Sequence, residues 1–103
     1  MGKRKVLSES ELKDLVLPEK GEVLGVVERL LGSDHAMVRC TDNKVRLGRI
    51  RGKLKRKIWI RDGDVVLVVP WEFDDGKGDI IWRYTVAQVD WLKQNNYLPD
   101  NFA

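Results

Sequence analysis

The residues most able to do chemistry in this 103-residue chain are positively charged and gathered in one block. Nine Lys and Arg side chains fall between positions 44 and 61, with no Asp or Glu among them. They are Lys44, Arg46, Arg49, Arg51, Lys53, Lys55, Arg56, Lys57 and Arg61. All 16 acidic residues lie elsewhere, so the net charge of +3 conceals a polarised chain. Like charges at this density repel one another and phosphates would relieve the repulsion, so we predict a binding surface for a polyanion.

Two further residues are candidates for the same surface. Trp59 follows the basic connector at 53–57, where its ring could stack on an unpaired base, with packing in the core as the equal alternative. Arg83 lies on a predicted strand and either extends the RNA surface or is an ordinary exposed charge. The remaining tryptophans are predicted to pack: Trp71, Trp82 and Trp91.

The chain offers little for catalysis or metal binding. Its single histidine, His35, and single cysteine, Cys40, cannot form a cluster of metal ligands or a nucleophile–base pair. The segment 48–53 resembles a phosphate-binding loop, but its glycine spacing is one residue short and no Ser or Thr follows the lysine. We therefore predict no catalytic residue, no cofactor, no metal and no enzyme activity.

Composition also bears on where the protein works. No apolar run approaches the roughly 20 residues that a membrane-spanning helix needs, and no apolar core of a secretory signal follows the basic tip at 3–5. A lone cysteine is compatible with a reducing compartment. We expect a cytoplasmic protein that is a monomer when free and contacts no membrane.

The elements that must position these residues are mostly strands. Alternation of apolar and polar residues predicts strands over 35–41, 44–52 and 80–86. A stretch rich in Val and Leu predicts another over 22–31, and a continuous apolar run before Pro70 predicts a buried strand over 65–69. In the third strand we expect Val45 and Leu47 to face the core and Arg46 to point away from it. Because the apolar Ile50 has the opposite parity, we predict a β-bulge near Gly48. The Asp- and Gly-rich segment 74–79 is predicted to be a connection.

Five such strands, with an insert between the third and fourth, predict an all-β fold: a five-stranded OB-fold barrel with short N- and C-terminal helical segments. We divide the chain into a basic tip and short helix-like segment (1–20), the barrel (21–87), and a C-terminal helix with a short tail (88–103). In that helix, predicted over 87–95, Val89 and Leu92 should face the barrel. OB folds bind oligonucleotides on their second and third strands, where the basic block begins.

The kind of RNA can also be argued from composition. Between positions 21 and 61 the chain has one aromatic residue, Trp59, whereas proteins that bind single strands stack successive bases on several aromatic rings. Such a surface suits the backbone of a structured RNA better than a long unpaired strand.

Several segments resemble translation initiation factor 1A, most closely its archaeal form. The most specific likeness is the stretch 46–61, from Arg46-Leu47-Gly48 to Trp59-Ile60-Arg61, and the likeness spans roughly residues 20–99. The resemblance implies binding to rRNA of the small ribosomal subunit near the A site, with a role in initiator tRNA placement and start-codon selection. It also implies other initiation factors and the initiator tRNA complex as partners. Two alternatives stay open: a general RNA chaperone of OB type, and a protein–protein adaptor with a basic docking face.

Overall fold

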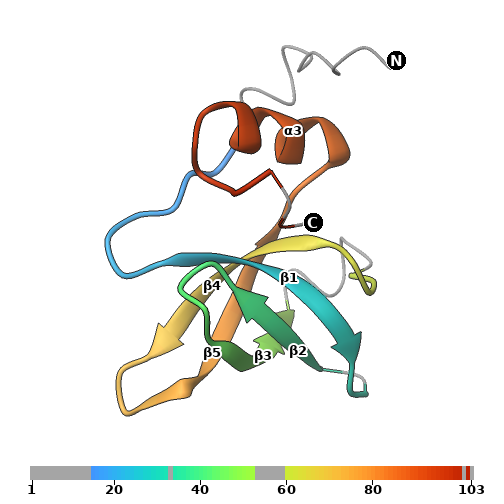
Figure 1. Ribbon diagram of the computed structural model, residues 1–103. Helices are drawn as coiled ribbons and strands as arrows, with labels where there is room; N and C mark the ends of the chain where they lie inside the picture. The colour runs from blue at the N-terminus through green and yellow to red at the C-terminus, as the bar shows by residue number, and fades with distance from the viewer. Residues whose placement is uncertain (1–14, 33, 53–59, 101, 103) are drawn as a thin grey trace.

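The computed structural model describes residues 15–32, 34–52, 60–100 and 102, which form a closed β-barrel and one helix. The elements are β1 (Val23–Leu30), β2 (His35–Cys40), β3 (Val45–Ile50), β4 (Val65–Trp71), β5 (Asp74–Arg83) and α3 (Val86–Gln94). The strands close in the order β1-β2-β3-β5-β4, and β3 and β5 are the parallel pair. Figure 1 shows α3 lying across one side of the barrel. The predicted five-stranded all-β barrel is confirmed.

The described residues contain no N-terminal helical segment of the kind expected. Most of it falls on residues 1–14, which lie outside the described residues, and residues 15–17 are not helical. This part of the predicted fold is therefore left open.

The interior of the barrel is filled by alternate residues of the strands. In β2 the inward side chains are Ala36, Val38 and Cys40, each at most 1% exposed, as the alternation predicted. They pack with residues from every other strand and from the segment before β4: Val27, Ile50, Ile60, Val66, Val68 and Ile80. A barrel core of this kind requires one inward face per strand.

A second apolar cluster lies outside the barrel, beneath α3. Val65 and Leu67 of β4 pack there with Leu92 of the helix and Tyr84. The unbroken apolar run of β4 is thus explained, because its residues are buried alternately in the barrel and under the helix. Val89 and Leu92 face the barrel as predicted, and the predicted C-terminal helix is confirmed.

The last strand ends sooner than predicted because a helix cap takes over. The Thr85 hydroxyl accepts a hydrogen bond from the Gln88 N–H at 3.2 Å, and the Gln88 side chain accepts one from the Thr85 N–H at 3.0 Å. This capping box starts α3 at Val86. The predicted strand over 80–86 was therefore wrong at its C-terminal end.

The same strand also begins earlier than predicted, at Asp74 rather than Ile80. The Asp- and Gly-rich segment 74–79 is not a connection but the first half of β5, paired with the end of β4 in a hairpin. Its Gly78 is buried, and a Cβ there would lie 2.6 Å from Val68 Cγ1 and 2.9 Å from the Val69 carbonyl oxygen. Glycine is needed for the close approach of two strands, not for a turn.

The bulge expected near Gly48 was also wrong. The β2–β3 register runs without a shift from His35↔Arg49 to Arg39↔Val45. Gly48 points inward, where a Cβ would lie 2.8 Å from Ile80 Cδ1, so β3 keeps one parity throughout. The inward-facing positions of β3 are consequently 46, 48 and 50.

Replacing Gly78 by Ala should destabilise the barrel, since the Val69 backbone cannot move away from the added methyl group. We expect Gly78→Ala to lower the free energy of unfolding by about 1–3 kcal/mol. Gly76→Ala in the same strand is the control, because its nearest neighbour would be Asp74 Oδ1 at 3.4 Å. Urea unfolding followed by tryptophan fluorescence measures both, and equal stabilities would contradict this account.

Candidate nucleic-acid interface

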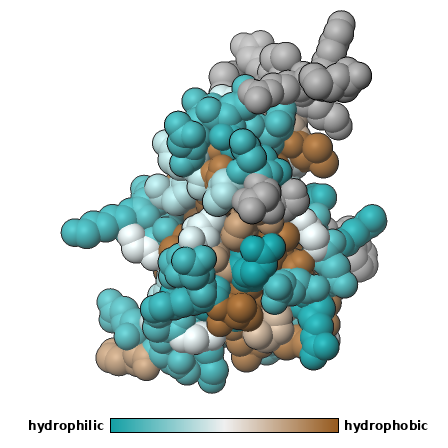
Figure 2. All heavy atoms as spheres, viewed as in Figure 1, coloured by the Kyte–Doolittle hydropathy of each residue, from teal (hydrophilic) through white to brown (hydrophobic). Residues whose placement is uncertain are grey.

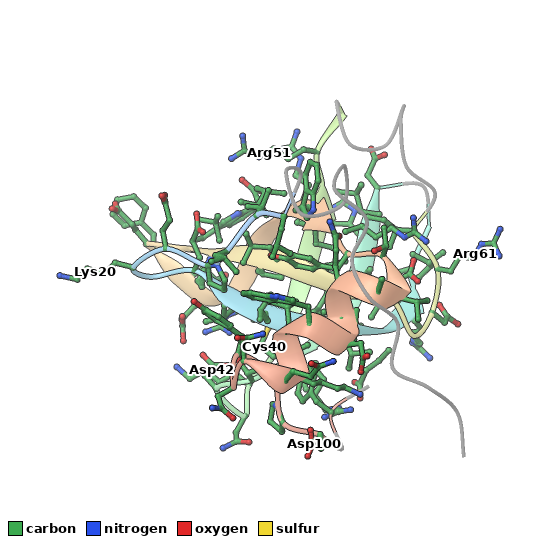
Figure 3. The ribbon with its side chains drawn as sticks, turned by 90° about the horizontal axis from the view of Figure 1, so that it is seen from above. Lys20, Cys40, Asp42, Arg51, Arg61 and Asp100 are labelled. Carbon is green, nitrogen blue, oxygen red and sulfur yellow. The ribbon has the colours of Figure 1, made fainter. Side chains whose placement is uncertain are left out.

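Strand β3 carries the basic block, and the structure divides the block between its two ends. Lys44 and Arg46 lie where β3 begins, while Arg49 and Arg51 lie where it ends. In Figure 3 Asp42, the partner of Arg46, and Arg51 lie on different sides of the molecule. The block therefore does not emerge as one continuous patch.

Arg46 is buried, and the prediction that it points away from the core was wrong. Only 2% of its side chain is exposed. Its guanidinium donates to both carboxylate oxygens of Asp42, at 3.0 and 2.8 Å, and to Asp75 Oδ1 at 3.0 Å. Its Nε donates to the Asp75 carbonyl at 2.8 Å. Inward parity of β3 puts this charge at the mouth of the barrel, and two carboxylates satisfy it there.

These contacts shift the pKa values of the partners in opposite directions. The hydrogen bonds from Arg46 hold the pKa of Asp42 below its usual range, and Lys44 and Arg46 do the same for Asp75. The hydrogen bond with Asp42 raises the pKa of Arg46, which is charged at any pH at which the protein folds. Burial raises the pKa of the neighbouring Cys40 thiol, so the cysteine is a neutral core residue.

Lys44 is also occupied by a carboxylate of the same protein, because its ammonium pairs with Asp75. The basic block itself contains no acidic residue, so this partner could not be recognised from the neighbouring residues. Asp75 approaches from β5, far along the chain, in a segment that was predicted to be a connection. Lys44 and Arg46 are thus the least suited of the block to meet an external phosphate.

The end of β3 is different, because its guanidinium groups are exposed. Arg51 has 58% of its side chain exposed and pairs with Asp79 at 3.1 Å. Asp79 also accepts from Trp71 Nε1 at 3.2 Å. Arg49, Arg51, Gly52 and Asp79 line an open pocket of about 220 Å³. Trp71 is 38% exposed, so the ring that was predicted to pack is only partly covered and lies at the surface.

The turn before β4 brings two more basic residues to this end of the barrel. Asp64 Oδ2 accepts from Arg83 Nε at 3.1 Å and from the Arg61 backbone N–H at 2.8 Å, so the two arginines lie around one carboxylate. Arg61 is exposed and, like Arg49, makes no ion pair with another described residue. Arg83 is partly buried and paired.

Hydrogen bonds place the end of β3 and this turn beside the same β1–β2 connection. The Asp34 carbonyl accepts from the Ile50 N–H at 2.7 Å, and Asp62 accepts from the Leu30 N–H at 3.1 Å. We call this region the connector end of the barrel: Arg49 and Arg51 lie where β3 enters the connector and Arg61 lies where the chain leaves it, well apart from Arg51 in Figure 3. Lys53, Lys55, Arg56, Lys57 and Trp59 lie outside the described residues, between Gly52 and Ile60.

The fold gives the class of protein before any comparison. A closed five-stranded barrel in the order β1-β2-β3-β5-β4, with an insert between β3 and β4, is the architecture of oligonucleotide-binding folds. Its third strand ends in exposed arginines beside that insert.

Comparison with known proteins assigns the family. The family described as "Translation initiation factor 1A / IF-1" matches residues 12–103, and the chain belongs to it. It is 52% identical over 100 residues to translation initiation factor 1A of Methanopyrus kandleri, covering 97% of this chain and 88% of the relative. It is 53% identical over 93 residues to the Archaeoglobus fulgidus protein of that name, covering 88% and 96%. The predicted resemblance to the archaeal form is confirmed.

Solved structures agree with this assignment. The solution structure of translation initiation factor IF-1 from a Wolbachia endosymbiont of Brugia malayi is 33% identical, with a TM-score of 0.50 over 73% of this chain and 90% of that one. YjeQ from Thermotoga maritima aligns with a TM-score of 0.53 at 24% identity over 62% of this chain, which shows a shared fold alone. No helix among the described residues is long and apolar enough to cross a membrane.

Replacing Asp42 by Asn should test the buried ion pair through pH. A carboxylate whose pKa is lowered on folding stabilises the protein above its ordinary pKa, and that contribution is lost as pH falls through the folded value. At pH 7 we therefore expect Asp42→Asn to cost about 1–2 kcal/mol of unfolding free energy. The difference from wild type should shrink below pH 3.8, the ordinary value for an aspartate. Urea titrations across this range measure it, and a difference independent of pH would refute the ion-pair explanation.

Proposed function

We propose that the connector end of the barrel binds rRNA of the small ribosomal subunit near the A site. From there the protein assists initiator tRNA placement and start-codon selection. It does so by occupying the site and not by catalysis. Other initiation factors and the initiator tRNA complex are the proposed partners, and the cytoplasm the proposed location. Family membership supports this role.

The observation that carries the proposal is the exposure of Arg49, Arg51 and Arg61 at one end of the barrel. Arg49 and Arg61 have no ion pair with another described residue, and Arg51 is more than half exposed. An exposed guanidinium with few partners in the protein can form two parallel hydrogen bonds to a phosphate, and few existing contacts must be broken for this.

The connector 53–59 joins Gly52 to Ile60 along the chain. No residue of 53–59 is more than four peptide units from Gly52 or Ile60. The four basic side chains at 53, 55, 56 and 57 are consequently proposed to contribute to the same surface.

The roles of the other basic residues follow from their partners. Arg46 is excluded from the proposed surface, because its guanidinium is buried and fully engaged. Lys44 lies at the other end of β3 and is paired with Asp75. Arg51 and Arg83 would exchange an exposed or partly exposed carboxylate for a phosphate, and such pairs contribute little stability.

A structured RNA target fits the outer face of β2 and β3. At the centre of that face Met37 lies opposite Leu47, and both are aliphatic and only partly exposed, while the flanking pairs are His35 with Arg49 and Arg39 with Val45. Aliphatic side chains offer no platform for successive bases. Backbone contacts to folded rRNA therefore suit the described surface better than a long single strand does.

Charge reversal tests the proposal directly. We expect Arg49→Glu, and the fourfold variant with Lys53, Lys55, Arg56 and Lys57 changed to Glu, to lose co-sedimentation with purified small subunits. Wild-type affinity should fall with salt at a log–log slope of roughly −3.5 to −4.5, corresponding to about five neutralised phosphates.

The control for this experiment is Lys20→Glu, which makes the same change of charge at an exposed site that projects elsewhere in Figure 3. Unchanged co-sedimentation of the charge-reversed variants would remove the proposal. Equal binding to unstructured RNA would favour a general chaperone. Association with an acidic protein that survives nuclease treatment, without rRNA, would favour an adaptor.

Trp59 remains predicted either to stack on a base or to pack in the core. If it stacks, Trp59→Ala should keep the stability of the wild type and weaken subunit binding by the 1–3 kcal/mol typical of one base–aromatic contact, roughly 5- to 150-fold. If it packs, stability and binding should fall together. Paired measurements of urea unfolding and subunit affinity separate the two outcomes.

A further inference from the structure

The β4–β5 hairpin presents an aromatic side chain that the RNA proposal does not use. Phe73, in the turn between Trp71 and Asp74, is 99% exposed. Figure 2 shows an apolar projection standing out from polar surroundings at the end of this hairpin. A single exposed apolar residue is common on proteins, so what matters is how firmly the turn holds this one in place.

The hairpin is fixed at its base by the buried arginine. Arg46 bonds both the carbonyl and the carboxylate of Asp75, two residues after Phe73. Asp74 Oδ1 accepts from the Gly76 N–H at 3.1 Å, and its other oxygen pairs with Lys77 at 3.7 Å. The turn is thus anchored on the strand that follows it. An aromatic ring presented on an ordered backbone loses little conformational entropy when a partner covers it.

The charges around the turn favour a protein over a nucleic acid. Glu72, beside Phe73, is exposed and makes no ion pair with another described residue. Each nearby cation already has a carboxylate partner on this hairpin, Asp75 for Lys44 and Arg46 and Asp74 for Lys77. A phosphate backbone would meet the unpaired carboxylate of Glu72 here, and to reach a cation it would have to displace Asp74 or Asp75. Aromatic anchors buried in a pocket are typical centres of protein–protein interfaces.

We propose that Phe73 is the anchor of a second binding surface, which inserts into an apolar pocket of a protein whose rim carries a Lys or Arg opposite Glu72. This second surface rests on the proposed function, because the partner is expected in the initiation complex. In Figure 1 the β4–β5 hairpin and the turn before β4 lie on opposite sides of the barrel. A partner on Phe73 would therefore leave the Arg61 part of the rRNA surface accessible, although Trp71 and Asp79 bring the hairpin nearer to Arg51. The protein would then link rRNA to this partner.

The test replaces Phe73 by the photoreactive residue p-benzoylphenylalanine in the full chain. Complexes are assembled from purified small subunits, initiation factors and initiator tRNA, and sedimented before and after irradiation. We expect a cross-link to a protein peptide that survives nuclease digestion, in about tenfold higher yield than from the same residue at Val86. Val86 is the matched control because it is 69% exposed and lies at the start of α3.

A second change tests the charge of the rim. Adding Glu72→Lys to the photoreactive variant should reduce the protein cross-link severalfold and leave sedimentation with the subunit unchanged. A cross-link to rRNA, or a yield no higher than at Val86 in complexes that contain the protein, overturns this inference and leaves the proposed function standing. If the wild type is absent from the complexes, the proposed function fails and this inference fails with it.

Discussion

The guanidinium of Arg46 is the one charged group that the described part of the fold buries, and much of the barrel is arranged around it. It joins the turn before β3 to the start of β5 through Asp42 and Asp75, next to the point at which the parallel β3–β5 pairing begins at Leu47 and Lys77. Removing either carboxylate would leave the buried Arg46 charge with only one partner. The resulting loss of folding free energy exceeds the net stability that the intact ion pair contributes. The geometry of the β4–β5 hairpin depends on this contact.

That constraint also decides what β3 can offer a ligand. β3 and the residue that follows it carry arginines at 46, 49 and 51, of which the first is buried and the other two are exposed. Their chemistry is identical, and the difference is the direction in which the pleat turns each side chain. The proposed binding surface is therefore narrower than the basic block, and it is shifted toward the connector.

Much of the fold could be predicted because alternation in β2 and the apolar run of β4 are local signals. The burial of Arg46 was missed, because one of its partners, Asp75, lies 29 residues away in the chain and the role of the nearby Asp42 was not recognised. Placing the apolar Val45 and Leu47 in the core required a bulge to return Ile50 to it. Giving the whole strand the parity of Ile50 would have placed Arg46 and Gly48 inside, as they are. The Asp- and Gly-rich start of β5 was misassigned because its glycines resemble those of a turn.

The acidic partners at the connector end argue for a reversible surface rather than against one. The Arg51–Asp79 and Arg83–Asp64 pairs are exposed or partly exposed, so solvent screens them and each contributes little to stability. A phosphate can replace such an exposed carboxylate while the barrel stays folded. To replace Asp42 beside the buried Arg46, a phosphate would first have to open the barrel. Burial thus separates the arginines that hold the barrel from those free to leave their partners for RNA. The free protein meanwhile avoids the self-repulsion that a fully unpaired basic patch would bring.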